Sequence, residues 1–206
     1  MEYKLVVVGP LETNCYLVYC GETLECAVID PGAEADRIFP AIVECGLKPV
    51  VILNTHGHID HIGANRDVKD KFGVSLRIHP LDAPLLGKVQ QFELSFFLGA
   101  KESPPADLPL ADGETVAFGR CGLEVIHTPG HTPGSVSFRG HKVLFSGDTL
   151  FSGGVGRTDL PGGSTRDLET SIRERILRLP PETIVLPGHG PWTTVGDELA
   201  SNPFLG

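Results

Sequence analysis

Four side chains that could bind metal ions lie within six residues, directly after the apolar run at 50–53. They are His56, His58, Asp60 and His61. Side chains two residues apart in extended backbone lean the same way, so His56 and His58 would line one pocket. Asp60 and His61 follow as the chain turns into a helix, and they would line a second pocket beside it. Without a metal ion, such a cluster would lose stability through charge repulsion and unpaired polar groups.

Three further candidates for metal binding come late in the chain, and each follows a glycine at the end of an apolar run. They are His131, Asp148 and His189. Imidazole and carboxylate without thiolate suit a catalytic zinc, iron or manganese ion, whereas structural zinc sites usually draw on cysteines. The donor types therefore predict a catalytic centre for divalent metal ions, with zinc as the first expectation and iron or manganese as alternatives.

The other histidines of the chain are His79, His127 and His141. A lone histidine in a loop is more often a surface or hydrogen-bonded residue than a metal ligand. We therefore expect these three side chains to take no part in metal binding.

The elements that must position these residues are mostly strands. Short β-type runs are expected at 4–8, 16–19, 26–29, 50–53, 74–78, 123–126, 136–138, 143–145 and 183–186. Helical patterns interrupt them at 35–45, 62–72 and 166–179, and Ser164 or Thr165 would cap the last helix. The segment 81–110 is expected to be a lid or a partly helical excursion.

This order of elements predicts two sheets packed together with helices on both outer faces, an α+β fold in one domain over residues 1–206. Loops at one edge of such a sandwich can collect polar groups from distant parts of the chain. Glycine and proline mark sharp turns at the strand ends, and most of the histidines lie in those turns.

Composition excludes several classes of partner. The formal net charge is −9, and the 17 Lys and Arg residues are scattered, which argues against binding nucleic acid. No apolar run is long enough for a signal peptide or a membrane span. The five cysteines form no CxxC pair and lie in apolar surroundings, which favours reduced thiols and a cytoplasmic location. The sequence leaves the oligomeric state open.

Several motifs together resemble the metallo-β-lactamase-fold hydrolases. The motifs are HxHxDH at 56–61, TPGHTPGS at 128–135, FSGDTLF at 145–151 and LPGHG at 186–190. More narrowly, GGVGRTDLPGG at 153–163 and NPFL at 202–205 are similar to the short hydroxyacylglutathione hydrolase-like proteins, relatives of glyoxalase II. The resemblance implies a four-layer αββα sandwich.

The resemblance also implies a role for each candidate ligand. The first metal ion would be held by His56, His58 and His131, the second by Asp60, His61 and His189, and both by a bridging Asp148. A hydroxide shared by the two ions would attack a thioester such as S-D-lactoylglutathione, a small anionic substrate. Asp60 would also orient this hydroxide. Asp30 would accept a hydrogen bond from a ligand histidine, although an aspartate that only forms a turn is the alternative.

The substrate and the reaction keep alternatives. Larger glyoxalase II enzymes bind glutathione partly through an added C-terminal domain, and this chain ends before that domain would begin. Arg157 stands where the family loop carries a basic residue, whereas Asp159 stands where an aromatic residue is expected, and these two side chains could simply pair with each other. In the same segment 81–110, Phe92, Phe96 and Phe97 could shape an acyl pocket, or belong to the core.

Three rival functions remain. Persulfide dioxygenases resemble the chain too, share a GRTD loop and use one iron held by two histidines and an aspartate. A lactonase or β-lactamase activity is a further hydrolytic alternative, and a non-catalytic metal-binding module is a different class altogether. Retention of Asp60, His61 and His189 favours the two-metal hydrolase over the dioxygenase.

Overall fold

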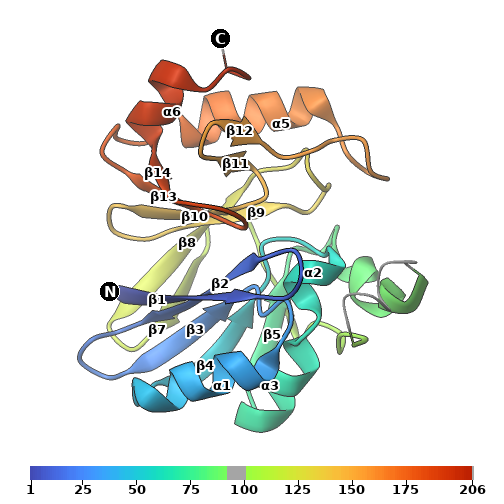
Figure 1. Cartoon of the computed structure of the whole chain (residues 1–206), viewed down its shortest axis with the longest axis vertical. Helices are drawn as coiled ribbons and strands as arrows, with labels where there is room; N and C mark the ends of the chain where they lie inside the picture. Colours follow the sequence, from blue (N-terminus) through green and yellow to red (C-terminus); the bar gives the residue numbers. More distant parts are fainter. Residues whose placement is uncertain (92–100, 206) are drawn as a thin grey trace.

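The computed structural model of the chain describes residues 1–91 and 101–205, and its strands in these ranges form two six-stranded sheets and one two-stranded ribbon (Figure 1). The first sheet contains, in spatial order, β1 (Glu2–Val8), β2 (Thr13–Tyr19), β3 (Glu25–Ile29), β4 (Lys48–Leu53), β5 (Ser75–Ile78) and β6 (Leu108–Pro109). The second contains β14 (Thr193–Thr194), β13 (Ile184–Pro187), β10 (Val143–Gly147), β9 (Val136–Arg139), β8 (Cys121–His127) and β7 (Thr115–Phe118). The ribbon joins β11 (Leu150–Phe151) and β12 (Gly154–Val155).

Helices cover the outer face of each sheet (Figure 1). The first sheet is covered by α1 (Ala35–Glu44) and α3 (Asn65–Phe72), and the second by α5 (Thr165–Ser171), its π-helical continuation η2 (Ile172–Ile176) and α6 (Val195–Ser201). Two short helices lie beside the site, α2 (Ile59–Ile62) and the 3₁₀ helix η1 (Ala83–Gln91). The expected four-layer αββα sandwich of the α+β class is therefore confirmed.

Consecutive residues of one strand pack into different layers, because side chains alternate across a sheet. Val28 belongs to the core beneath α1, whereas its neighbour Ile29 packs between the two sheets. In the second sheet, Phe145 lies between the sheets and Leu144 packs against Leu168 of α5. Strands buried on both faces read as continuous apolar runs, which is why the sequence predicted them well.

Strand direction brings the candidate residues to one edge of the sandwich. In the second sheet, β8 and β10 are both antiparallel to β9, and β13 is parallel to β10, so the carboxyl ends of β8, β10 and β13 lie at the same edge. In the first sheet, β3 and β4 are parallel and end together. The two sheets meet there, since the backbone N–H of Asn14 donates to the carbonyl of Gly188 at 2.7 Å.

Every run expected as a strand is a strand, although the ends differ by a few residues. The helix expected at 62–72 is divided, because α2 ends at Ile62 and α3 begins only at Asn65. The helix expected at 166–179 changes to a π-helix after Ser171. Its cap is Ser164, whose side chain accepts a hydrogen bond from the backbone N–H of Asp167.

The segment 81–110 is partly helical, as expected, because it contains η1, and it also contributes β6. The described residues do not include Phe92, Phe96 and Phe97, so the acyl pocket that these residues could shape stays a prediction. No helix in the described part of the chain is long and apolar enough to cross a membrane.

Candidate metal centre

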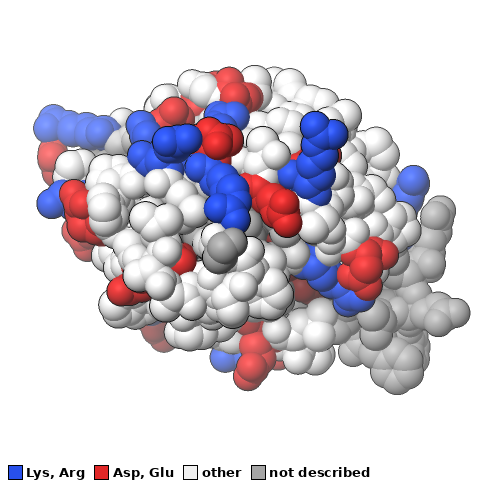
Figure 2. Space-filling view, turned by 90° about the horizontal axis from the view of Figure 1, so that it is seen from above, with Lys and Arg blue, Asp and Glu red and all other residues white. Residues whose placement is uncertain are grey.

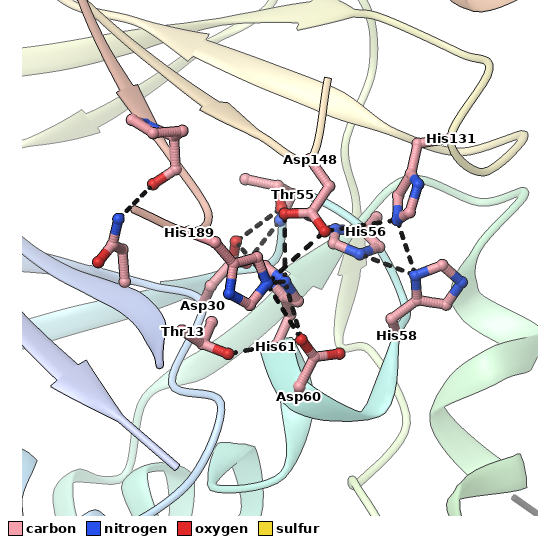
Figure 3. Close-up of polar contacts among 12 residues, drawn as sticks. Thr13, Asp30, Thr55, His56, His58, Asp60, His61, His131, Asp148 and His189 are labelled. Carbon is pink, nitrogen blue, oxygen red and sulfur yellow. Dashed lines mark hydrogen bonds and ion pairs between the residues drawn. The ribbon is translucent and has the colours of Figure 1, made fainter. Parts of the chain in front are cut away.

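Three histidines turn one ring nitrogen each toward a common point, and we call them the first cluster (Figure 3). His56 and His58 follow β4, and His131 follows β8. Nε2 of His56 lies 3.1 Å from Nδ1 of His58, and that same Nδ1 lies 2.8 Å from Nε2 of His131. His56 and His131 are buried, and His58 is half-buried. The cluster therefore offers three nitrogens to one small cation.

Asp60, His61 and His189 form the second cluster beside the first (Figure 3). Asp60 and His61 lie on α2, and His189 follows β13. Nε2 of His61 lies 3.2 Å from Nε2 of His189. Oδ2 of Asp60 lies 3.2 Å from Nε2 of His189 and 3.5 Å from Nε2 of His61. This group offers two nitrogens and a carboxylate to a second cation.

The carboxylate of Asp148 lies between the two clusters. Its Oδ2 is 3.6 Å from Nε2 of His131 and 3.7 Å from Nε2 of His189. Its Oδ1 is 3.4 Å from Nε2 of His61 and, among the described residues, is a buried oxygen without a hydrogen-bond donor. Because a buried carboxylate oxygen is costly without a partner, this position is suited to a ligand shared by two cations.

Asp30 and Thr55 fix two of the imidazoles from behind. Oδ2 of Asp30 accepts from Nδ1 of His61 at 2.9 Å and from the hydroxyl of Thr55 at 2.6 Å. Because the Thr55 hydroxyl donates to Asp30, it accepts from Nδ1 of His56, at 3.0 Å. In the neutral form of each ring, the N–H group thus points outward and the lone pair of Nε2 points into the centre. Asp30 was expected beneath the metal loops, and the structure places it there.

Backbone carbonyls do the same for two other imidazoles. Nδ1 of His131 donates to the carbonyl of Arg157 at 2.8 Å, and Nδ1 of His189 donates to the carbonyl of Leu11 at 2.9 Å. These carbonyls accept but cannot donate, so in the neutral form of each ring the proton lies on Nδ1 and the lone pair of Nε2 faces the cluster. This pattern is the one that metal-ligating histidines almost always show.

The charge state of the centre differs between the two clusters. Burial and the neighbouring His131 and His61 lower the pKa of His58 to about 3, and burial lowers the pKa of His56 well below its usual value. Burial also acts to lower the pKa of His61, but the charges of Asp148, Asp60 and Asp30 outweigh it and raise that pKa to about 10. The second cluster therefore favours a positive charge, whether a proton or a metal ion supplies it.

The donor set fits two divalent metal ions. In the first cluster, neutral imidazole nitrogens facing one another at 2.8–3.1 Å lack enough protons to satisfy each other, and a cation between them would satisfy them. Gly188 shows how tightly the groups are placed, since a Cβ there would collide with Oδ1 of Asp148 and with the ring of His61. The side chains suit zinc, iron or manganese alike.

The other residues singled out from the sequence lie outside the two clusters. The Arg157 guanidinium forms two hydrogen bonds of 2.7 Å with the Asp159 carboxylate, and both side chains are exposed. This is the pairing expected as the alternative to substrate binding. His79 and His127 stack face to face with ring centroids 4.3 Å apart.

Two features of the site were not expected. The carbonyl of Arg157, rather than its side chain, contacts a candidate ligand. Asp82 is fully buried and links the loops of the first cluster. The resemblance and its place at a strand end singled out Asp30, and Asp82 has only the second of these signals, since it follows β5.

The comparison with protein families decides the family. A model of the metallo-beta-lactamase superfamily matches residues 8–189. The chain belongs to the metallo-beta-lactamase superfamily.

Crystal structures of similar superfamily chains agree with the fold. The chain is 41% identical to BLEG-1, a B3 metallo-beta-lactamase, with a TM-score of 0.92 and 99% of each chain covered. It is 42% identical to TTHA1623 in a di-iron-bound form, with a TM-score of 0.90, covering 98% of this chain and 100% of that one.

Curated relatives within the superfamily differ in activity. The hydroxyacylglutathione hydrolase GloC of Haemophilus influenzae is 40% identical, and the match covers 100% of this chain and 98% of the relative. The human mitochondrial persulfide dioxygenase ETHE1 is 34% identical, over 94% of this chain and 71% of the relative. Together with the family match and the paired clusters, the hydrolase relative makes the chain a metal-dependent hydrolase of this superfamily.

Proposed function

We propose that the chain hydrolyses thioesters such as S-D-lactoylglutathione with two divalent metal ions, zinc first among them. The observation that carries the proposal is the position of Asp148 between two complete clusters, each with three side chains of its own. The first cluster would hold one ion and the second cluster the other, with Asp148 shared. The activity named for the relative of Haemophilus influenzae and the di-iron form of the similar crystal structure support it.

The chemistry divides between the ions and the protein. When bound, two such ions would polarise the thioester carbonyl and lower the pKa of a bound water molecule toward neutrality. Asp60 would accept a hydrogen bond from this water and orient it toward the substrate, because its Oδ2 points into the centre. His61 and His189 are kept in place from behind, so the centre does not reorganise during the reaction. The leaving thiolate needs no general acid.

A small anionic substrate fits the surface better than a polyanion. Figure 2 shows Lys and Arg interspersed with Asp and Glu on the face that α5 and α6 form. Arg175 pairs with Asp112 at 2.7 Å and Arg178 with Glu174 at 3.1 Å. Because acids lie among the basic residues, this face is poorly suited to a nucleic acid. Two divalent ions supply local positive charge for a small anion instead.

The proposed reaction is tested with a panel of substrates on protein loaded with zinc, iron or manganese and on metal-free protein. We expect ultraviolet-detected hydrolysis of S-D-lactoylglutathione by loaded protein only. Hydrolysis of a β-lactam or a lactone in its place would reassign the substrate and keep the two-metal chemistry.

Persulfide dioxygenase is the second candidate, because the human enzyme of that name is 34% identical. Oxygen consumption with glutathione persulfide, one iron per chain and no hydrolysis would establish it and overturn the thioesterase. Failure of every substrate on fully loaded protein would leave only a metal-binding module.

A further inference from the structure

One buried carboxylate joins the two loops that carry the first cluster. Asp82 is 0% exposed and lies in the turn between β5 and η1. Its Oδ2 accepts from the backbone N–H of Gly57 at 2.9 Å and from the hydroxyl of Thr132 at 2.7 Å. Its Oδ1 accepts from the backbone N–H of Gly134 at 2.7 Å. All of these contacts are charge-assisted and buried, which makes them strong.

The partners of Asp82 are the neighbours of the ligands. Gly57 separates His56 from His58, and Thr132 directly follows His131. Asp82 therefore holds both loops of the first cluster by their backbone or by an adjacent hydroxyl. This anchoring matters most for His58, because its Nε2 forms no hydrogen bond within residues 1–91 and 101–205.

The surroundings of Asp82 accept little other than aspartate. A Cβ on Gly134 would lie 2.5 Å from Oδ1 of Asp82, and a Cβ on Gly57 would lie 2.7 Å from the Cβ of Leu85 in η1. A longer side chain at 82 has no room between these backbones. Asparagine fits the space but has one acceptor oxygen, so its amide would turn an N–H toward the N–H of Gly134 or lose the other two donors.

The second cluster does not depend on this residue. Its His61 is held by Asp30, its His189 by the carbonyl of Leu11, and its Asp60 lies on α2. Asp82 donates to or accepts from none of these groups. A change at position 82 thus acts on one cluster and leaves the contacts of the other intact.

We propose that Asp82 is a positioning residue for the first cluster: it fixes the loop of His56 and His58 against the loop of His131 and so sets the affinity of that cluster alone for a divalent ion. The inference rests on the proposed two-metal site, but it is tested by measuring metal binding and does not require turnover. Loss of an outer hydrogen-bonding partner of metal ligands typically costs about 10- to 100-fold in metal affinity.

The test is Asp82→Asn, with zinc binding resolved by site. Crystals of wild type and variant are equilibrated at limiting zinc, and anomalous scattering gives the occupancy of each cluster. Competition with a chromophoric chelator gives the two dissociation constants. We expect the first cluster to bind zinc about 10- to 100-fold more weakly and the second to bind as in wild type. Equal weakening of both clusters, or unchanged binding at the first, overturns the inference.

The matched control is Asp112→Asn. Asp112 also accepts a hydrogen bond from a backbone N–H, that of His127 at 2.8 Å, but it contacts neither ligand loop of the first cluster. We expect unchanged zinc binding at both clusters, and a loss at the first cluster equal to that of Asp82→Asn would overturn the inference.

A second pair of variants serves if Asp82→Asn does not fold. Thr132→Val removes one of the donors to Asp82, whereas Thr132→Ser keeps the hydroxyl. We expect weaker zinc binding at the first cluster in Thr132→Val and normal binding in Thr132→Ser. Equal behaviour of the two variants contradicts the role of Asp82. Failure of the wild type to hydrolyse any thioester overturns the proposed function and leaves this result standing.

Discussion

At the scale of residues, the donor types predicted the site and the hydrogen bonds explain it. Three histidines and an aspartate within six residues carried enough information to identify metal-binding chemistry. The sequence could not show that His58 faces the centre through Nδ1 while His56 uses Nε2, because ring orientation depends on partners such as Thr55 that only the fold supplies. The sequence also could not decide whether Arg157 binds the substrate or pairs with Asp159, because both roles fit the same two side chains.

The role of Asp148 is tested by Asp148→Ala. This change removes a carboxylate whose oxygens lie near His61, His131 and His189, so we expect hydrolysis to be abolished and at least one metal ion per chain to be lost. Elemental analysis and the thioester assay measure the two effects. His141→Ala is the control, because His141 is exposed and belongs to neither cluster. Full activity of Asp148→Ala would exclude the bridging role.

The pairing of Arg157 predicts an effect on substrate binding. In Asp159→Ala the guanidinium of Arg157 is freed at the rim of the site, and we expect the KM for an anionic thioester to fall a few-fold at unchanged kcat. The effect is small because an exposed ion pair is weak and screened by salt. A neutral thioester is the control substrate, and its KM should be the same for the wild type and for Asp159→Ala. An unchanged KM for S-D-lactoylglutathione would remove Arg157 from substrate recognition.

At the scale of elements, apolar periodicity predicted the long strands and helices, and short elements escaped it. The seven-residue helix α6 carries only two buried side chains, so its sequence shows little periodicity. The strand β7 alternates exposed and buried residues over four positions, so it has no continuous apolar run. The break between α2 and α3 lies at Gly63 and Ala64, where an apolar pattern continues although the helix does not.

The variant Gly188→Ala tests whether the metal centre needs the tight packing of the turn after β13. A methyl group at this position would collide with Oδ1 of Asp148 and with the ring of His61, so the second cluster must open. We expect loss of hydrolysis and of one metal ion. Gly87→Ala in η1 is the matched control, because nothing lies within 4 Å of a Cβ built there. A crystal structure of Gly188→Ala with both ions in place would show that the packing of this turn is unimportant.

At the scale of the whole molecule, the sequence predicted the layers and the candidate ligands, but it predicted only some of the residues that hold the ligand loops together. The four-layer α+β sandwich was expected and is confirmed, because strands buried on both faces read as apolar runs. Asp82 went unnoticed, since its partners lie 25 to 52 residues away. The assignment of residues 1–206 to one domain, the cytoplasmic location and the absence of nucleic-acid partners stay predictions.

Metal binding should stabilise the whole fold, because the two clusters join loops of both sheets. We expect a chelator to lower the Tm of the loaded protein and added zinc to restore it, with a rise that grows with free zinc concentration. Differential scanning calorimetry measures this. Variant His131→Ala, which lacks a ligand of the first cluster, should show a smaller rise. Equal Tm values with and without metal would show that the clusters do not bind ions in the folded state.

Whether two cations act together in one chain is measured by a metal titration of turnover. Metal-free protein is loaded stepwise with zinc, and the rate of S-D-lactoylglutathione hydrolysis is recorded against metal bound per chain. We expect the rate to rise until two ions are bound per chain, because Asp148 lies between both clusters. A rate that reaches its maximum at one ion per chain, or no hydrolysis at full loading, would contradict this expectation.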